Sequence, residues 1–217
     1  MIDYAQRRTM MVDTQVRPSD VTKFPIIDAM LDTPREAFVP EQLREAAYVG
    51  ENLDLGGGRT LLEPRTLAKI VDALTFEPSD VVLDIACGLG YSTAIAAQLS
   101  EFVIGVEDNE ARAAEAQSIL SELGIDNAAI VSGPLKEGAA KSGPYDIIMI
   151  QGAVQAVGDN LTAQLKEGGR VAAIFSEGAL GVVRIGHKQD GSITWKFAFN
   201  ASAPLLRDFE VADAFSL

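Results

Sequence analysis

The stretch from residue 81 to residue 97, VVLDIACGLGYSTAIAA, most constrains what this 217-residue chain can fold into. Val81–Ile85 is a short apolar run broken by a single acid, which is typical of a strand buried inside a sheet. Gly88 and Gly90 follow, and glycine adopts the positive φ angles of a tight turn without steric cost. Apolar residues then recur at helical spacing up to Leu99. The stretch therefore predicts a buried strand, a tight turn and a helix.

Acidic residues follow two of the predicted strands. Asp84 comes at the end of the first, and small residues stand at every second position after it, at Ala86, Gly88 and Gly90. Glu107 follows the next apolar run, and its separation from Asp84 is 107 − 84 = 23 residues. In nucleotide sites of this architecture, an acid roughly 20 residues beyond the glycine turn binds the ribose hydroxyls. The spacing therefore predicts a site for a nucleotide-like ligand.

The glycine pattern separates three alternatives for this turn. Thr93 stands where the third glycine of G-x-G-x-x-G would be, counted from Gly88, which argues against a nicotinamide-dependent dehydrogenase. The pattern from Asp84 to Gly90 instead resembles the first motif of class I methyltransferases, which bind S-adenosylmethionine. The resemblance implies that Glu107 holds the ribose of that cofactor. A ligand-free turn with a surface glutamate is the remaining alternative.

Composition narrows the function classes. A hydrophobic content of 47% in 217 residues is enough for one domain with a sizeable core. The net charge of −13 argues against binding to nucleic acid or to an anionic membrane. The chain has no apolar run of the roughly 18 residues that a spanning helix needs, so we expect a cytoplasmic protein. Cys87 and His187 are the only residues of their types, so we expect neither a disulfide nor a metal site.

Strand–helix alternation predicts an α/β fold with a doubly wound, mostly parallel Rossmann-like sheet. Residues 1–60 lack this alternation, so we expect a helical cap and substrate loop there, a cofactor-binding α/β core over 61–217, and one domain over 1–217. A Gln-Asp-Gly turn signal near the end predicts an antiparallel hairpin. The expected helices run over 4–16, 64–74, 110–123 and 161–166, and the expected strands over 81–85, 102–106, 128–131, 145–150, 170–175, 181–188 and 192–199.

Several segments beyond the turn resemble one methyltransferase family. They are TPREAFVP at 33–40, Ala47-Tyr48, LGGGRTLLEP at 55–64, GYSTA at 90–94 and QLKEGGR at 164–170. In order and over about residues 8 to 180, the chain resembles the protein-L-isoaspartate O-methyltransferases. The resemblance implies a carboxyl O-methyltransferase that uses S-adenosylmethionine and acts on isoaspartyl residues of damaged proteins or peptides.

The resemblance also implies a set of site residues. Thr60 and Leu62 stand at the catalytic positions of the loop. The implied cofactor-binding residues are Gly58, Asp84, Ala86, Cys87, Gly88, Gly90, Tyr91, Glu107, Asp108, Pro134, Leu135 and Gln151. Two alternatives stay open for Tyr91, which either covers the ligand or packs against the cap. Two stay open for Arg59, which is either solvated or a clamp for a substrate carboxylate.

The chain departs from the family pattern in three places. Leu62 stands where the family usually has a Ser that is taken to act in catalysis. Pro134 stands where an Asp usually helps to hold the adenine, and Gly50 replaces another Asp. Two hypotheses therefore remain besides the dehydrogenase. The chain is an isoaspartyl methyltransferase, or it is a divergent member that methylates another acceptor or has little catalytic activity.

Overall fold

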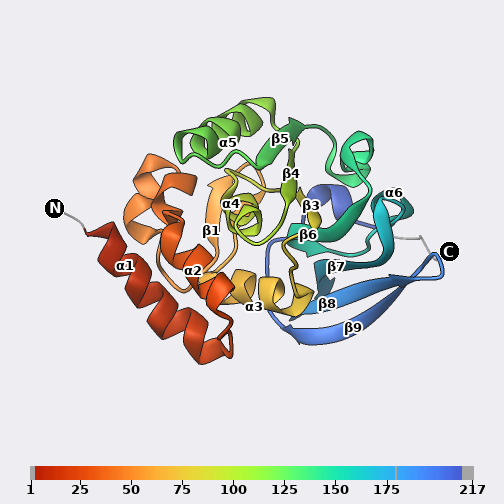
Figure 1. The fold of residues 1–217 in the computed structure, drawn as a ribbon, viewed down its shortest axis with the longest axis horizontal. Helices are drawn as coiled ribbons and strands as arrows, with labels where there is room; N and C mark the ends of the chain where they lie inside the picture. Colours follow the sequence, from red (N-terminus) through yellow and green to blue (C-terminus); the bar gives the residue numbers. More distant parts are fainter. Residues whose placement is uncertain (1–2, 179, 212–217) are drawn as a thin grey trace.

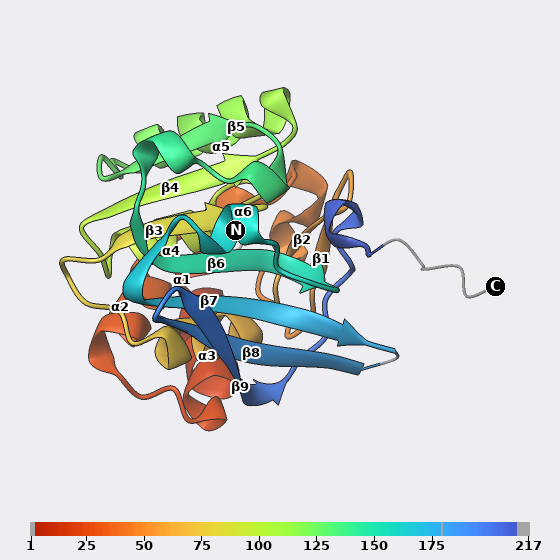
Figure 2. The ribbon, with the colours of Figure 1, turned by 90° about the vertical axis from the view of Figure 1, so that its right-hand side faces the viewer.

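A seven-stranded sheet forms the centre of the computed structural model, which describes residues 3–178 and 180–211. Its strands are β3 (Val81–Ile85), β4 (Phe102–Glu107), β5 (Ala128–Ser132), β6 (Tyr145–Val154), β7 (Leu165–Glu177), β8 (Leu180–Gln189) and β9 (Ser192–Asn200). They lie in the order β5-β4-β3-β6-β7-β8-β9 (Figures 1 and 2). The pairs from β5 to β7 are parallel, whereas β8 and β9 are antiparallel additions. The expected fold class is confirmed.

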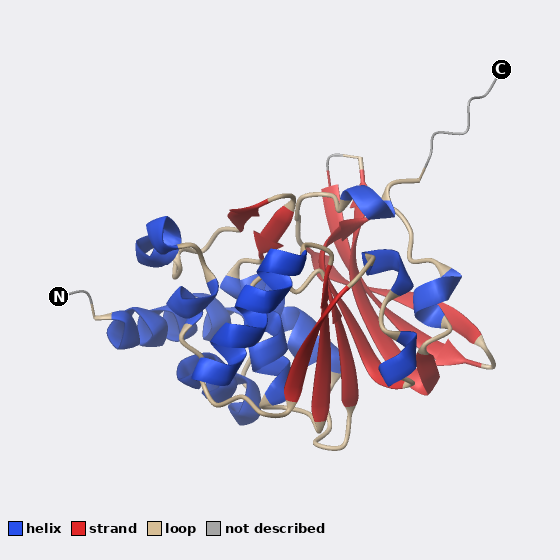
Figure 3. Ribbon diagram, turned by 90° about the horizontal axis from the view of Figure 1, so that it is seen from above, coloured by secondary structure: helices blue, strands red, loops and turns tan. Residues whose placement is uncertain are grey.

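Helices lie on both sides of the sheet, as Figure 3 shows. They are α1 (Tyr4–Met11), continued by a π-helical turn (Val12–Val16), α2 (Phe24–Asp32), α3 (Pro64–Leu74), α4 (Tyr91–Ala97), α5 (Glu110–Glu122) and α6 (Asp159–Thr162). Val82 packs into the hydrophobic cluster that includes the N-terminal cap helices. Its neighbour Leu83 packs into a second cluster with α6 and the C-terminal segment. Because successive strand residues face opposite ways, these central strands are buried on both faces.

Local sequence signals explain where several elements begin and end. Pro64 occupies the first turn of α3, where its missing N–H costs no hydrogen bond. Asn109 caps α5 and accepts a hydrogen bond from the backbone N–H of Arg112 at 2.9 Å. Asp190 and Gly191, with φ of 51° and 75°, form the turn between β8 and β9. The predicted C-terminal hairpin is therefore confirmed.

Two expectations about secondary structure are wrong. The helix expected over 161–166 is only the short α6, and β7 already begins at Leu165. The backbone N–H of Tyr145 donates to the carbonyl of Gln164 at 2.8 Å, so pairing with β6 overrides the helical pattern there. The second error concerns the cap, where β1 (Leu53–Gly56) and β2 (Arg59–Leu61) form an unexpected hairpin. The three-glycine run supplies its turn.

None of the helices in the described part of the chain combines the length and the apolar character that crossing a membrane requires.

Candidate cofactor and acceptor site

The turn between β3 and α4 is wound in a conformation that favours residues with little or no side chain. Ala86, Gly88 and Gly90 have φ angles of 60°, 59° and 95°, in the left-handed region that strains residues with a Cβ. A Cβ on Gly88 would also lie 3.0 Å from Cδ1 of Leu55. The turn stands at the carboxyl end of β3, between β4 and β6, where open parallel sheets bind their ligands. Glycine at position 88 therefore suits this turn, which packs against Leu55 of the cap.

Asp84 and Gln151, both expected to bind cofactor, meet inside the fold behind this turn. The buried carboxylate of Asp84 accepts hydrogen bonds from Ser92 Oγ at 2.6 Å, Thr93 Oγ1 at 2.7 Å and Gln151 Nε2 at 2.7 Å. Burial raises the pKa of Asp84 to about 6, although the three hydrogen bonds oppose that shift. The network fixes the start of α4 to β3 and β6. In this arrangement Asp84 braces the turn, and a direct contact with cofactor stays a prediction.

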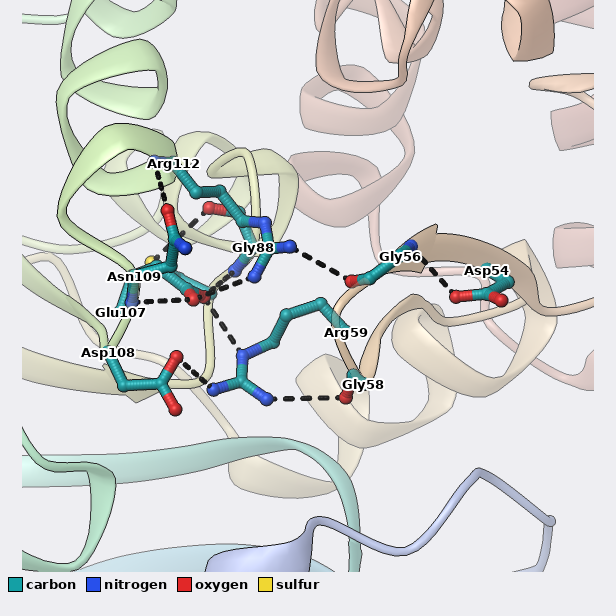
Figure 4. Close-up of polar contacts among 10 residues, drawn as sticks. Asp54, Gly56, Gly58, Arg59, Gly88, Glu107, Asp108, Asn109 and Arg112 are labelled. Carbon is teal, nitrogen blue, oxygen red and sulfur yellow. Dashed lines mark hydrogen bonds and ion pairs between the residues drawn. The ribbon is translucent and has the colours of Figure 1, made fainter.

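Glu107 lies at the end of β4, fully buried, with donors on both of its oxygens (Figure 4). Oε2 accepts from Nε of Arg59 at 3.0 Å and from the backbone N–H of Gly88 at 3.2 Å. Oε1 accepts from Nη1 of Arg112 at 3.0 Å and from the backbone N–H of Asn109 at 3.3 Å. Burial raises the pKa of Glu107, and the two arginines oppose this shift. The structure thus joins the predicted ribose acid to the glycine turn.

The β1–β2 turn reaches over this acid from the cap. Gly56, Gly57 and Gly58 have φ angles of 80°, 59° and 76°, so the chain reverses tightly and brings Arg59 over Glu107. Close by is a cavity of about 370 Å³, within the size range of small-molecule sites. Its lining residues are Gly57, Gly58, Arg59, Asp108, Leu135, Arg207 and Asp208. Predicted cofactor residues from two other segments, Asp108 and Leu135, therefore share one cavity with the loop.

The other predicted residues of the loop and the helix lie in the core. Leu62 is 2% exposed, and its carbonyl accepts from Nη2 of Arg35 at 2.7 Å. Arg35, also buried, donates through Nε to the carbonyl of Ala47 at 2.6 Å. Cζ of Arg35 lies 4.8 Å from the ring centroid of Tyr91, whose ring also meets Phe38 edge-on. Of the two alternatives for Tyr91, the structure has the one in which its ring packs against the cap.

Four further predicted residues differ in their exposure. Cys87 is buried, and burial raises the pKa of its thiol well above the ordinary value, which keeps the thiol protonated and favours a packing role. Thr60 is buried in β2, opposite Asp54. Pro134 is exposed, whereas its neighbour Leu135 is buried and lines the cavity.

Arg112 is a site residue that sequence reasoning missed. Its Nη2 donates to the carbonyl of Gly56 at 2.9 Å, so that one side chain ties the β1–β2 turn to Glu107. The sequence does contain a feature that points to Arg112, because this residue lies in the first turn of α5. A cation there opposes the helix dipole and needs a compensating partner. Arg59 is buried rather than solvated, since it pairs with Glu107 and with Asp108, where Nη2 lies 2.6 Å from Oδ1, and its role as a clamp for a substrate carboxylate stays a prediction.

Comparison with known proteins identifies the family. The model of the family Protein-L-isoaspartate(D-aspartate) O-methyltransferase (PCMT) matches residues 6–201. The chain belongs to this family. It is 32% identical over 213 residues to the protein-L-isoaspartate O-methyltransferase of Methylorubrum extorquens (strain PA1), a match that covers 97% of this chain and 93% of the relative. It is 36% identical over 168 residues to that of Syntrophus aciditrophicus (strain SB), with 77% of each chain covered.

Solved structures of isoaspartate methyltransferases share the fold. A protein-L-isoaspartate O-methyltransferase superposes with a TM-score of 0.79 at 23% identity, covering 94% of this chain and 66%, just under two thirds, of that chain. A Plasmodium falciparum structure assigned to the same enzymes, in complex with S-adenosyl-L-homocysteine, gives a TM-score of 0.78 at 18% identity. It covers 96% of this chain and all of the other.

Proposed function

We propose that this isoaspartate methyltransferase family member is a carboxyl O-methyltransferase that uses S-adenosylmethionine and acts on L-isoaspartyl residues of damaged proteins. One observation carries the proposal. The backbone N of Gly88, in the glycine turn after β3, lies 3.2 Å from Oε2 of Glu107, at the end of β4. A close-approach turn and a ribose-binding acid at neighbouring strand ends are the two parts that a nucleoside cofactor needs. The family match supplies the reaction and the acceptor.

The residues present fit this cofactor. Gly88 and Gly90 have positive φ and no Cβ, so the turn presents no side chain at these positions to the cofactor's methionine portion. The carboxylate of Glu107 is an acceptor of the kind that ribose hydroxyls require, provided that a side chain now bonded to it moves away. Leu135, at the position of a usual Gly in the family motif, offers the adenine an apolar wall. When bound, S-adenosylmethionine supplies an electrophilic methyl group.

Methyl transfer to a carboxylate mainly requires the protein to position the acceptor. A carboxylate with a pKa near 4 is already ionised at neutral pH, so no general base is needed to create the nucleophile. The chain's contribution is to orient the acceptor and to exclude water around it. The absence of a histidine from the site is consistent with such chemistry.

Two arginine side chains hold the acceptor loop in place. Arg35 bonds the carbonyls of Ala47 and Leu62, and so fastens the end of β2 to the cap. Arg112 holds the carbonyl of Gly56 at the other end of the same hairpin. With both ends fixed, the backbone N–H groups of the loop and the hydroxyl of Thr60 are the groups we assign to positioning the acceptor carboxylate.

A second candidate function is favoured by Leu62. Its side chain is part of the hydrophobic core and carries no hydroxyl to align an acceptor oxygen. Loss of a hydrogen bond to a charged group costs roughly 1.5–3 kcal/mol, which lowers a rate roughly 10- to 150-fold if all of it is expressed in the transition state. On this alternative, the chain binds S-adenosylmethionine but methylates another acceptor or turns over slowly.

The deciding experiment uses two peptides that are identical except for one linkage. One peptide contains an L-isoaspartyl residue, and its control contains a normal aspartyl residue at the same place. Transfer of labelled methyl from S-adenosylmethionine to the isoaspartyl peptide alone supports the proposal. Cofactor binding without transfer to either peptide supports the divergent alternative and contradicts the proposed acceptor.

A further inference from the structure

We propose that Arg59 competes with the cofactor ribose for Glu107, so that this one loop residue sets the affinity for S-adenosylmethionine. The inference rests on the proposed function and deepens it. In the structure the ribose acid is already fully used by the chain's own donors (Figure 4). A bound cofactor must therefore displace one of them.

The number of hydrogen-bond donors around Glu107 shows why one of them must be displaced. A carboxylate has about four lone-pair positions. Four donors occupy them, with two on each oxygen, at distances from 3.0 to 3.3 Å. A ribose diol needs acceptor positions on the same buried carboxylate. Two of the present donors, the N–H groups of Gly88 and Asn109, belong to the main chain at the turn after β3 and at the N-cap of α5. One of the two arginines must therefore give way.

Arg59 is the arginine that can leave at lower cost. Its guanidinium already lies beside a second acid, Asp108, and it follows three successive glycines with positive φ. Arg112 instead projects from α5, where its backbone is fixed by the cap at Asn109. Arg59 also bonds Oε2, the oxygen shared with Gly88 of the cofactor turn. The displaced position is thus on the side of the glycine turn.

Asp108 is a second acidic partner for the displaced guanidinium of Arg59. Nη2 of Arg59 lies 2.6 Å from Oδ1 of Asp108, a pair that is close but lacks hydrogen-bond geometry in the present arrangement. Asp108 is 40% exposed, unlike Glu107. Arg59 can rotate toward Asp108 and solvent without leaving its charge unpaired. This exchange moves the Arg59 side chain, while Arg112 still holds the Gly56 carbonyl.

The experiment titrates S-adenosylhomocysteine calorimetrically into the full-length parent, Arg59→Gln and a control, Arg17→Gln. Arg17 is an exposed arginine paired with Asp13 at 3.1 Å, far along the chain from the site. We expect Arg59→Gln to bind at least about tenfold tighter than the parent, since a competing charged hydrogen bond is worth roughly 1.5–3 kcal/mol. Arg17→Gln should match the parent.

A second measurement uses the parent protein, and a variant is needed only to assign the NMR signal of Arg59. The side-chain Nε–H resonance of Arg59 in the parent should shift or vanish when S-adenosylhomocysteine binds, as its bond to Glu107 is lost. The inference is overturned if that resonance is unchanged at saturation, or if Arg59→Gln and the parent bind equally; the proposed function survives either result. Absence of binding to all three proteins instead contradicts the proposed cofactor, and with it this inference.

Discussion

Replacement of Leu62 by Ser separates the structural role of this position from its catalytic one. The Leu62 side chain is 2% exposed and belongs to the large hydrophobic cluster on the cap side of the sheet. Truncation of a buried Leu to Ala costs about 2–5 kcal/mol, because contacts are lost and a cavity forms. A serine adds an unpaired buried hydroxyl at about 1–3 kcal/mol. Both Leu62→Ala and Leu62→Ser should therefore unfold at lower denaturant concentration than the parent, and the serine variant should be the less stable of the two.

Activity should rank the same two variants in the opposite order. A hydroxyl at this place can bond the acceptor carboxylate, as the family's usual Ser is taken to do, whereas an alanine cannot. We expect Leu62→Ser to transfer labelled methyl to an isoaspartyl peptide roughly 10- to 150-fold faster than Leu62→Ala, if the whole of a 1.5–3 kcal/mol bond acts in the transition state. The alanine variant controls for the loss of packing. Equal rates would refute the catalytic reasoning, and a cost below about 1 kcal/mol for Leu62→Ala would refute its place in the core.

Two further changes probe the cofactor side of the site. Between about pH 5 and pH 7.5 the parent should lose roughly 1.4 kcal/mol of stability relative to Asp84→Asn, because a folded-state pKa of about 6, raised from 3.8, makes ionisation above it costly. The amide still accepts from Gln151 and donates to Ser92, and urea unfolding at both pH values measures the difference. Pro134→Asp should tighten S-adenosylhomocysteine binding severalfold in a calorimetric titration, since proline offers the adenine neither an N–H nor a side-chain acceptor. An unchanged affinity would mean that another acid already binds the adenine.

The sequence was sufficient for the framework of the site. Strand, turn and helix around Gly88 follow from local rules, namely an apolar run, positive φ and helical spacing. The position of Glu107 follows from the fixed length of one helical crossover between neighbouring parallel strands. Such features are predictable because each depends on residues that are close in the chain or on a standard connection.

What the sequence did not reveal depends on long-range side-chain contacts. Arg59 pairs with Glu107 across 48 positions, and no local pattern records which acid a loop arginine will meet. The burial of Leu62 likewise depends on how the cap packs. A helix is expected over Gln164 and Leu165, but pairing with β6 determines their structure.

The most direct test of the account is whether Glu107 binds the cofactor. Calorimetric titration with S-adenosylhomocysteine should be made in the Arg59→Gln protein, because there the competing arginine no longer masks the contribution of Glu107. Adding Glu107→Ala should weaken binding at least about tenfold, as expected for loss of a hydrogen bond to a charged group. Adding Glu110→Ala, which removes an exposed acid of the same segment, should change nothing. Equal affinities with and without the Glu107 carboxylate would contradict the assignment of this site.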